Sequence, residues 1–309
     1  MLHTPVLAEA IIEWLRIKPE GTYVDATVGT GGHAIEIARR LTTGRLVGMD
    51  RDPQALEIAR ERLREFEERV TLVHTEFSKI GEVVSDMKLA AVDGVIADLG
   101  VSSFELDTPE RGFSFRWPAA LDMRMNPEQS LMAAEIVNQW PEKDLANVLY
   151  QFGEERESRK IARAIVRARF IRDTEHLATV VAGARKARGR QRLHPATKTF
   201  LALRIAVNRE LEELGQFLNR TPATLNSGAR WAILSYHSLE DRMVKRGFQE
   251  LARTGDFRIL TKKVVQPGEA EIQRNPRARS AKLRVIEKHT ERQMEQPSRG
   301  YDEGEREAS

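Results

Sequence analysis

The stretch "VDATVGTGGHA", residues 24–34, combines an acid with a cluster of glycines. Asp25 ends a short apolar run, and Gly29, Gly31 and Gly32 follow before a stretch of helical character. A strand that leads through glycines into a helix is typical of sites for nucleotide-like ligands, because glycines allow the backbone to approach the ligand closely. The sequence therefore predicts a small-molecule site at this turn.

The glycine spacing excludes one class of ligand and leaves two others open. A triphosphate-binding loop needs a lysine after its second glycine, and none follows this cluster. A dinucleotide fingerprint fits Gly29, Gly31 and Ala34, with Asp50 about 20 residues further on to hold a ribose hydroxyl. That match is weak by itself, and Asp25 beside the turn would repel a pyrophosphate but suit a cation. The acid therefore favours S-adenosylmethionine, which carries an ammonium, a sulfonium and a ribose.

Polar and aromatic residues also follow the later apolar runs of this region. Phe77 could lie against an adenine, and Asp98 could face the methionine part or the methyl acceptor. Each acid alone could equally cap a helix or shape a turn. Ligands of parallel sheets bind where the carboxyl ends of the strands meet, so the register of these residues favours one shared site.

The elements that must position these residues alternate between strand and helix. Apolar runs typical of strands cover residues 22–28, 45–50, 70–77 and 92–101, and helical patterns cover 32–41, 53–68 and 78–88. This alternation predicts βαβ units and a parallel sheet covered on both faces.

The second part of the chain departs from this alternation. After an irregular stretch come helical patterns over residues 129–170 and 199–218, a strand over 230–238, and two β-like runs, 257–265 and 281–289, expected to close the sheet as a hairpin. We predict a doubly wound, Rossmann-like α/β fold of the class I S-adenosylmethionine-dependent methyltransferases, with a helical insertion after the fourth strand. Residues 1–109 and 199–289 are predicted to form one discontinuous domain that binds S-adenosylmethionine. Residues 110–198 are predicted to form a helical insertion domain that binds the RNA substrate, and residues 290–309 a disordered tail.

Composition limits the chemistry further. The 309 residues include no cysteine, which excludes disulfides, thiolate metal sites and cysteine nucleophiles, and we expect no metal. Carbon-5 of a pyrimidine is usually methylated through a cysteine, so a nitrogen or oxygen acceptor is favoured. The N-terminus carries Glu9 and Glu13 and does not resemble a signal peptide, and no apolar run is long enough to span a membrane. We expect a soluble, cytoplasmic protein.

Basic residues gather in the predicted insertion. Residues 156–198 contain thirteen lysines or arginines against three acids, although the net charge of the chain is only +3. A second basic run, "NPRARSAKLR", covers 275–284. A single such helix is most often a solvated face, but two basic segments beside a methyl-donor domain favour a nucleic-acid partner.

A series of short motifs then gives a family resemblance. "HTPVL", "DATVGTGGH", "GMDRDPQAL", "DLGVSS", "RGFSF", "LDMRM", "GEER", "HPATKTF", "SYHSLEDRMVK" and "NPRARSAKLR" occur in this order. From His3 to about Lys288 the chain resembles the RsmH (MraW) family of ribosomal RNA small subunit methyltransferases. The resemblance implies methyl transfer from S-adenosylmethionine to the exocyclic N4 of a cytidine in the decoding region of bacterial 16S rRNA, near the P site.

By motif position, the resemblance also implies which residues bind the donor: Gly31, Gly32, His33, Asp50, Phe77, Asp98 and Glu105. The chain departs from the family at Glu105, where glutamine is usual, and a carboxylate there would disfavour the carboxylate of the donor. It also departs at Leu201, where glutamine is usual and which could border the acceptor pocket. "NSGAR", 226–230, replaces the usual Pro-Gly-Gly turn.

The acceptor chemistry suggests two catalytic candidates. The amino lone pair of cytosine is delocalised into the ring, so a group that pulls on an amino hydrogen would help it react. Asp98 is placed for this, and His237 at the end of the fifth strand is a second candidate, although a structural role for His237 is equally compatible. Asp122 and Arg124 could grip the nucleoside, but we favour a role in locking their loop. The target base must leave its stack to reach such a pocket.

Two alternatives remain open from the sequence. One is a non-catalytic RNA or ribosome-assembly factor that keeps the fold, which the departures at Glu105 and Leu201 would permit. The other is a dinucleotide-dependent oxidoreductase. The expected partner is 16S rRNA or the small ribosomal subunit, and the protein is expected to be a monomer or a homodimer.

Overall fold

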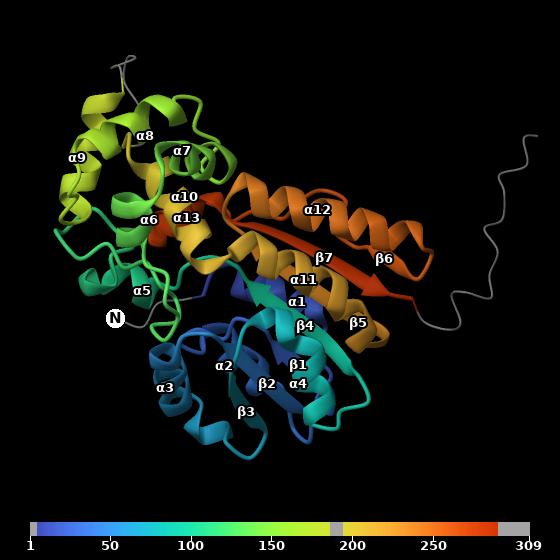
Figure 1. The fold of residues 1–309 in the computed structure, drawn as a ribbon. Helices are drawn as coiled ribbons and strands as arrows, with labels where there is room; N and C mark the ends of the chain where they lie inside the picture. The colour runs from blue at the N-terminus through green and yellow to red at the C-terminus, as the bar shows by residue number, and fades with distance from the viewer. Residues whose placement is uncertain (1–4, 186–193, 290–309) are drawn as a thin grey trace, which may run out of the picture.

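The computed structural model describes residues 5–185 and 194–289, and a seven-stranded sheet forms its centre (Figure 1). The predicted tail, 290–309, lies outside the described residues. So do four of the thirteen basic residues of the predicted insertion: Lys186, Arg188, Arg190 and Arg192. The strands lie in the order β3-β2-β1-β4-β5-β7-β6. Their bounds are β1 (Thr22–Asp25), β2 (Arg45–Asp50), β3 (Val70–His74), β4 (Val92–Asp98), β5 (Leu225–Ser235), β6 (Phe257–Ile259) and β7 (Lys282–Lys288).

The first five strands are parallel, and β7 runs antiparallel between β5 and β6. The strand order reverses beside β1, which pairs with both β2 and β4. This arrangement confirms the predicted doubly wound α/β fold with an antiparallel closing pair. The switch point beside β1 is where such sheets bind ligands.

Helices cover both faces of the sheet. Along β1, Tyr23 joins the core shared with α1 (Ala8–Leu15), α2 (Gly32–Ala38) and α3 (Pro53–Arg62). Val24 faces the other side and joins the core shared with α4 (Ile80–Asp86), α11 (Glu210–Thr224) and α12 (Ser238–Arg253). Successive strand residues point to opposite faces, so both sides of an apolar strand are buried here.

A third core lies in the helical insertion, which stands beside the carboxyl edge of the sheet in Figure 1. The chain enters it through α5 (Ser103–Asp107) and an irregular stretch. The predicted helical region then divides into α6 (Ala133–Gln139), α7 (Glu142–Gln151), α8 (Ser158–Arg167), α9 (Thr174–Ala184) and α10 (Thr197–Asn208). A short α13 (Glu269–Arg274) and 3-10 turns at 64–66, 77–79, 109–111 and 276–280 complete the described elements.

The predicted helix over 199–218 is in fact two helices, α10 and α11. Arg209 between them adopts the left-handed conformation with φ of 51°, which ends one helix and redirects the next. Phe200 and Leu203 pack in the insertion core, whereas Leu214 packs against the sheet. α10 therefore packs with the insertion and α11 with the sheet, and the boundary at 198/199 stays a prediction. Apolar spacing continues through both helices, so periodicity could not reveal the break.

The strands differ from prediction mainly at their ends. β5 begins at Leu225, five residues before the predicted start, because the "NSGAR" segment is part of the strand. The pairing register between β5 and β4 shifts at this segment, opposite Val92 and Gly94. β6 is only three residues long. Within the described ranges, no helix combines the length and apolarity needed to cross a membrane.

Candidate active site

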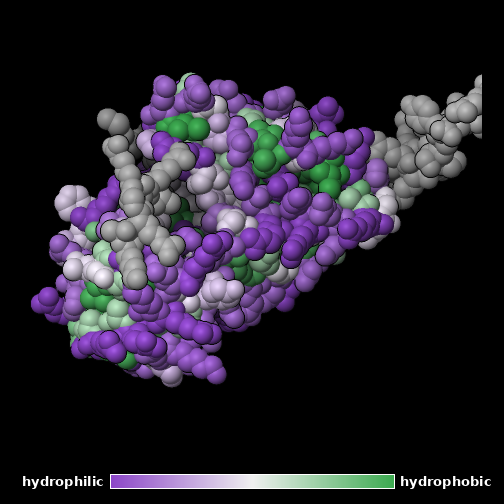
Figure 2. All heavy atoms as spheres, turned by 90° about the horizontal axis from the view of Figure 1, so that it is seen from above, coloured by the Kyte–Doolittle hydropathy of each residue, from purple (hydrophilic) through white to green (hydrophobic). Residues whose placement is uncertain are grey.

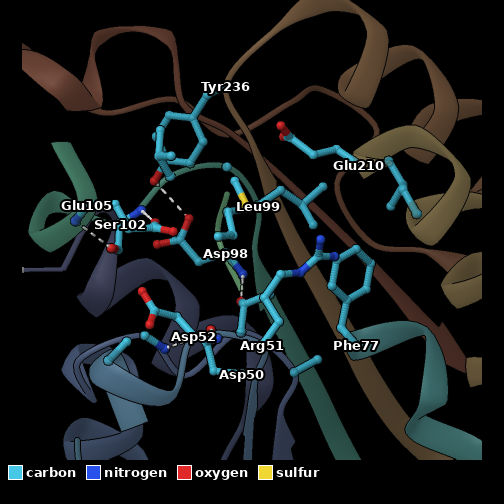
Figure 3. Close-up of a pocket in the computed structure, with 18 of the residues that line it drawn as sticks. Asp50, Arg51, Asp52, Phe77, Asp98, Leu99, Ser102, Glu105, Glu210 and Tyr236 are labelled. Carbon is cyan, nitrogen blue, oxygen red and sulfur yellow. Dashed lines mark hydrogen bonds between the residues drawn. The ribbon is translucent and has the colours of Figure 1, made fainter. Parts of the chain in front are cut away.

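A cavity lies at the carboxyl edge of the sheet, where β1, β2 and β4 end (Figure 3). Four of the residues predicted to bind the donor line it: Asp50, Phe77, Asp98 and Glu105. They come from separate strand ends and from α5, so only the fold brings them together. The predicted convergence at this edge is therefore present in the geometry.

Asp50 connects this cavity to the glycine turn. Its Oδ2 accepts a hydrogen bond from the backbone N–H of Gly29 at 2.7 Å, and its Oδ1 accepts one from Asp52 at 2.9 Å. Burial raises the pKa of Asp50, and these two bonds partly oppose that rise. Each carboxylate oxygen retains a lone pair, so the acid can still accept a hydroxyl donor.

An apolar wall faces Asp50 across the cavity. Phe77 packs edge-on against Phe217 with ring centroids 5.1 Å apart, and the guanidinium carbon of Arg51 lies 5.7 Å from its centroid. Ala26 and Leu214 also line the wall. A flat apolar group next to a hydrogen-bonding acid is the combination that an adenosine requires.

Glu105 is buried, with only 4% of its surface exposed. Its Oε2 accepts the N–H of Ser102 at 2.7 Å, and the Ser102 hydroxyl accepts the N–H of Glu105 in return, which forms a capping box at the start of α5. Burial raises the pKa of Glu105 to about 8, and the nearby Asp50 and Asp52 add to that rise. The side chain is therefore mostly a neutral acid at pH 7, which removes the predicted conflict with a donor carboxylate.

Asp98, at the end of β4, lies at the centre of the site. The Tyr236 hydroxyl donates to its Oδ1 at 2.8 Å, a bond drawn in Figure 3. His33 Nε2 lies 3.4 Å from its Oδ2. Burial and the charge of Asp98 raise the pKa of Tyr236 well above its usual value, so the phenol keeps its proton and remains a donor.

His33 lies between two acids, Asp98 and Asp25. Burial alone would lower its pKa, but the interaction with Asp98 and the charges of both acids outweigh burial and raise it. Asp25 itself is almost fully buried, and burial raises its pKa to about 7. It lines no cavity with the donor-site residues, so the sequence interpretation that it faces the ligand is not supported. Its charge contributes to the raised pKa of His33.

A second cavity of about 340 Å³ adjoins the first at Asp98. Asp98, Gly100, Ser102 and Tyr236 line both cavities. The predicted donor-binding residues Gly32 and His33 line the second cavity, with the N-terminal residues Pro5 and Val6 and with the segment 275–277. Asp98 is thus accessible from two spaces, as a group between a donor and an acceptor must be.

Gly31 lines neither cavity, although the resemblance implied donor contact. Its φ is 85°, a conformation that glycine adopts readily. It is the N-cap residue of α2. A Cβ atom at this position would lie 3.5 Å from Leu63 and 3.6 Å from Ala59. Its role in this geometry is to shape the turn.

His237 also lines neither cavity, so the geometry does not support a catalytic role. It is the N-cap of α12, where its Nδ1 accepts the N–H of Glu240 at 3.4 Å, and its Nε2 lies 3.2 Å from Glu240 Oε1. Tyr236, one residue earlier, is the one that reaches Asp98. Tyr236 was not among the predicted site residues, and the local backbone direction decides which of the two neighbours reaches Asp98.

The ligand atoms of Glu210, His237 and Glu240 lie within 4.8 Å of one another, close enough to suggest a metal site. Two observations oppose this. Because Nδ1 of His237 accepts a backbone N–H, the neutral ring carries its proton on Nε2, the atom that a metal would need. Glu210 also accepts two hydrogen bonds from Arg204, at 2.9 and 2.8 Å.

Several other residues have structural functions. Arg124 donates to both oxygens of Asp122, at 2.7 and 2.8 Å, and to the carbonyls of Pro127 and Gln129, which supports the expected locking of that loop. Arg111, which sequence reasoning missed, pairs with buried Asp52 at 2.9 Å. Leu201 lines neither of the two cavities.

The insertion presents cations to solvent. On α8, Ile161, Ala162 and Ile165 are buried, whereas Arg159, Lys160, Arg163 and Arg167 are exposed. Arg163 lies 3.4 Å from Glu142. Figure 2 shows that the side of the molecule seen from above is mainly hydrophilic, with hydrophobic residues in separate small areas. The predicted amphipathic helix is present, with its basic face outward.

Comparison with known proteins gives consistent matches across the chain. The model of a family described as the MraW methylase family matches residues 1–289. A ribosomal RNA small subunit methyltransferase H of Solibacter usitatus is 49% identical over 286 residues, which cover 93% of this chain and 99% of that protein. Proteins of the same name from Koribacter versatilis and Acidobacterium capsulatum are each 48% identical, over 92% and 93% of this chain and 93% and 98% of their own lengths.

Proposed function

Because the chain belongs to the MraW methylase family, we propose that it transfers a methyl group from S-adenosylmethionine to the exocyclic N4 of a cytidine in the decoding region of 16S rRNA, near the P site. The coarser statement, that the chain is an S-adenosylmethionine-dependent methyltransferase, follows from the family and its relatives. It removes the oxidoreductase alternative. The observation that carries the finer proposal is Asp98, which faces both cavities.

The residues of the first cavity fit the adenosine part of the donor. Asp50 would accept the ribose hydroxyls, and Phe77 with its apolar neighbours would hold the adenine. Asp50 and Asp98 line a space that suits a cation better than a pyrophosphate. Glu105, neutral at pH 7, can replace the usual glutamine because a protonated acid, like an amide, both donates and accepts. When bound, the donor supplies an electrophilic methyl on a positively charged sulfur.

Asp98 would act on the acceptor. One lone pair on each of its oxygens remains available beside Tyr236 and His33, so an amino N–H can donate to it. This bond draws the amino hydrogen away from the ring plane, restores density to the nitrogen lone pair, and gives the departing proton a destination. Holding the amino nitrogen in line with the methyl supplies much of the remaining rate enhancement.

Tyr236 and His33 would position Asp98. The Tyr236 hydroxyl fixes one carboxylate oxygen and keeps its own proton, because the pKa of Tyr236 is raised. His33 lies against the other oxygen, and its raised pKa favours the cationic ring that balances Asp98. The carboxylate is therefore held ready before the acceptor enters.

The exposed arginines of α8 would contact rRNA phosphates. Backbone phosphates dominate the affinity of such proteins and require no specific geometry, so exposed side chains of one sign suffice. An rRNA substrate would place the enzyme in the cytoplasm. The form of the substrate, naked 16S rRNA or the small subunit, is a separate outcome of the experiment below.

The test is methyl transfer from labelled S-adenosylmethionine to small subunits that lack this modification, with naked 16S rRNA in parallel. The RNA is digested to nucleosides and analysed by mass. Label in N4-methylcytidine supports the proposal, and the ratio of the two substrates identifies the preferred form. Donor binding without label in either RNA would instead favour the non-catalytic assembly factor.

A further inference from the structure

Large hydrophobic side chains are exposed in one part of the molecule only. Among the described residues, four such side chains are exposed, and all four belong to the insertion: Trp117, Met132, Tyr150 and Phe170. Single exposed hydrophobic side chains are common on protein surfaces, so their restriction to the insertion is the informative observation. Three of the four are aromatic, and aromatic rings exposed on a basic domain indicate a surface that meets a partner.

Two of these rings lie near the start of α9. Trp117 is 61% exposed, and its carbonyl accepts a hydrogen bond from the Thr174 hydroxyl at 2.7 Å. Thr174 and Ala119 are also joined, because the N–H of Thr174 donates to the carbonyl of Ala119 at 2.9 Å. Phe170, which is 71% exposed, precedes Thr174 by four residues, a span of at most about 14 Å. The first residue of α9 therefore connects the two rings.

Phe170 is held in place by its neighbours while its own side chain extends into solvent. Arg169 donates from Nε to the carbonyl of Val137 at 2.9 Å. Ile171 exchanges two hydrogen bonds with the side chain of Asn138, at 2.8 and 3.1 Å. Both neighbours are thus fixed to α6. A ring on a fixed backbone loses little conformational freedom when a ligand packs on it, which favours binding.

Exposed cations accompany the two rings. Arg116, Arg167 and Arg172 are exposed, and none of them forms an ion pair with another described residue. The acids nearest to them in this segment are Asp173, which caps α9, and Glu175. Proteins that bind single-stranded RNA combine cations, which contact the backbone phosphates, with aromatic rings, on which the unpaired bases stack.

We propose that Trp117 and Phe170 form a stacking surface for unpaired bases of the RNA substrate, with Arg116, Arg167 and Arg172 on the adjoining phosphates. The inference rests on the proposed function for RNA as the partner, and it adds that the insertion recognises single-stranded nucleotides. A base can stack on a protein ring only where it is free of its helix, which also holds for the target base. Neither ring lines either cavity, so this surface acts on RNA binding and not on methyl transfer.

The decisive variants are Trp117→Ala and Phe170→Ala. The probe is a mixed-sequence oligoribonucleotide of about 16 nucleotides, measured as a single strand and as a duplex. Each variant should raise the Kd for the single strand by roughly 5- to 150-fold, the effect of losing one stacked base. The Kd for the duplex should change less than about twofold, because paired bases do not reach the rings.

The salt dependence separates stacking from charge. The slope of log Kd against log salt should stay at the wild-type value in both alanine variants, because neither removes a phosphate contact. Trp117→Phe and Phe170→Tyr keep a ring and should keep the wild-type Kd. Since both side chains are mostly exposed, all four variants should unfold at the wild-type Tm.

The matched control is Tyr150→Ala. Tyr150 is 64% exposed on α7 of the same insertion, but the exposed residues near it are Asn147, Gln151 and Glu154, none of which is a cation. This variant should bind both RNA probes as the wild type does. An equal loss in Tyr150→Ala would mean that any exposed ring of the insertion matters, and it would overturn the assignment to Trp117 and Phe170.

The remaining outcomes separate the two proposals. If the wild type forms N4-methylcytidine and the alanine variants bind single-stranded RNA equally well, the inference is wrong and the proposed function stands. An equal loss for duplex and single strand, or a higher KM for assembled subunits alone, would also overturn the inference, the latter in favour of a protein contact. If the rings bind single-stranded RNA but the wild type methylates no cytidine N4, the proposed function fails and the RNA surface remains.

Discussion

The carboxyl edge of the sheet and the outer face of the insertion carry opposite charge in opposite surroundings. At the edge, Asp50 and Asp98 are largely enclosed and held by backbone or side-chain hydrogen bonds. On α8, Arg159 and Arg167 extend into solvent. Charges in enclosed sites interact strongly and respond to pH, whereas exposed charges are screened by salt. The edge is therefore suited to catalysis of methyl transfer, and the insertion to RNA binding that depends on salt. The following variants test this difference.

The largest expected effect is that of Asp98→Asn at the edge. An amide cannot take up the amino proton, so kcat should fall by roughly 10²- to 10⁴-fold, the usual contribution of a general base. The measurement is single-turnover methyl transfer at saturating donor. Asp86→Asn, at an exposed acid on α4, is the control and should match the wild type. A loss below tenfold in Asp98→Asn would contradict the role given to Asp98.

Glu105→Gln tests the pH response of the edge. The folded pKa of Glu105 is about 8 against an ordinary 4.5, so its stabilising contribution is complete below pH 4.5 and is lost as the pH rises through 8. At pH 8.5 the glutamine variant should therefore be more stable than the wild type by on the order of 2–4 kcal/mol, and equal to it near pH 4.5.

Urea unfolding at the two pH values measures this difference. Glu61→Gln, at a carboxylate side chain that is 78% exposed, serves as the control and should show no such change with pH. Equal stability of Glu105→Gln and wild type at both pH values would mean that ionisation of Glu105 does not destabilise the fold. Glu105 would then not be held as a neutral acid that can replace glutamine.

On the insertion, the double variant Arg159→Gln/Arg167→Gln should act through salt. We expect the KM for the RNA substrate to rise about tenfold at low salt and the slope of log KM against log salt to fall by about two, one for each phosphate that an arginine no longer neutralises. The kcat and the donor Kd should not change. The matched control is Arg60→Gln/Arg64→Gln, at exposed arginines near α3. The same salt slope in all three proteins would remove α8 from the RNA interface.

The smallest effect is expected for His237→Asn, which keeps a capping acceptor on α12. The kcat should stay within about threefold of the wild type, far from the roughly 100-fold or greater loss of a general base. The free energy of unfolding should fall by at most about 1 kcal/mol. Rate measurements beside thermal unfolding test both statements. A hundredfold loss of kcat in a folded protein would restore His237 to the mechanism.

The two regions also differed in how far the sequence predicted them. The parallel strands, the glycine turn and the convergence of Asp50, Phe77 and Asp98 follow from apolar runs and the geometry of parallel sheets. Arg209 was not foreseen, because apolar spacing continues through the left-handed residue that separates α10 from α11.

The direction of single side chains at the site could not be predicted. Tyr236 and His237 are neighbours, and the backbone aims one at Asp98 and the other at Glu240. Asp25 is turned inward beneath the glycine turn and lines no part of either cavity. Asn275 and Arg277 line the second cavity because Arg277 pairs with Asp107 on α5 and Glu271 on α13 accepts the N–H of Leu7 in the N-terminal segment. Such contacts depend on tertiary packing, which local patterns do not encode.

The most direct test of the central claim uses 16S rRNA from cells that lack the gene for this protein. Its decoding region is isolated, digested and analysed for N4-methylcytidine before and after complementation. We expect the nucleoside to be absent without the gene, to return with the wild type, and to stay absent with Asp98→Asn at equal protein abundance. An unchanged amount of N4-methylcytidine in all of these cells would mean that this protein does not form it.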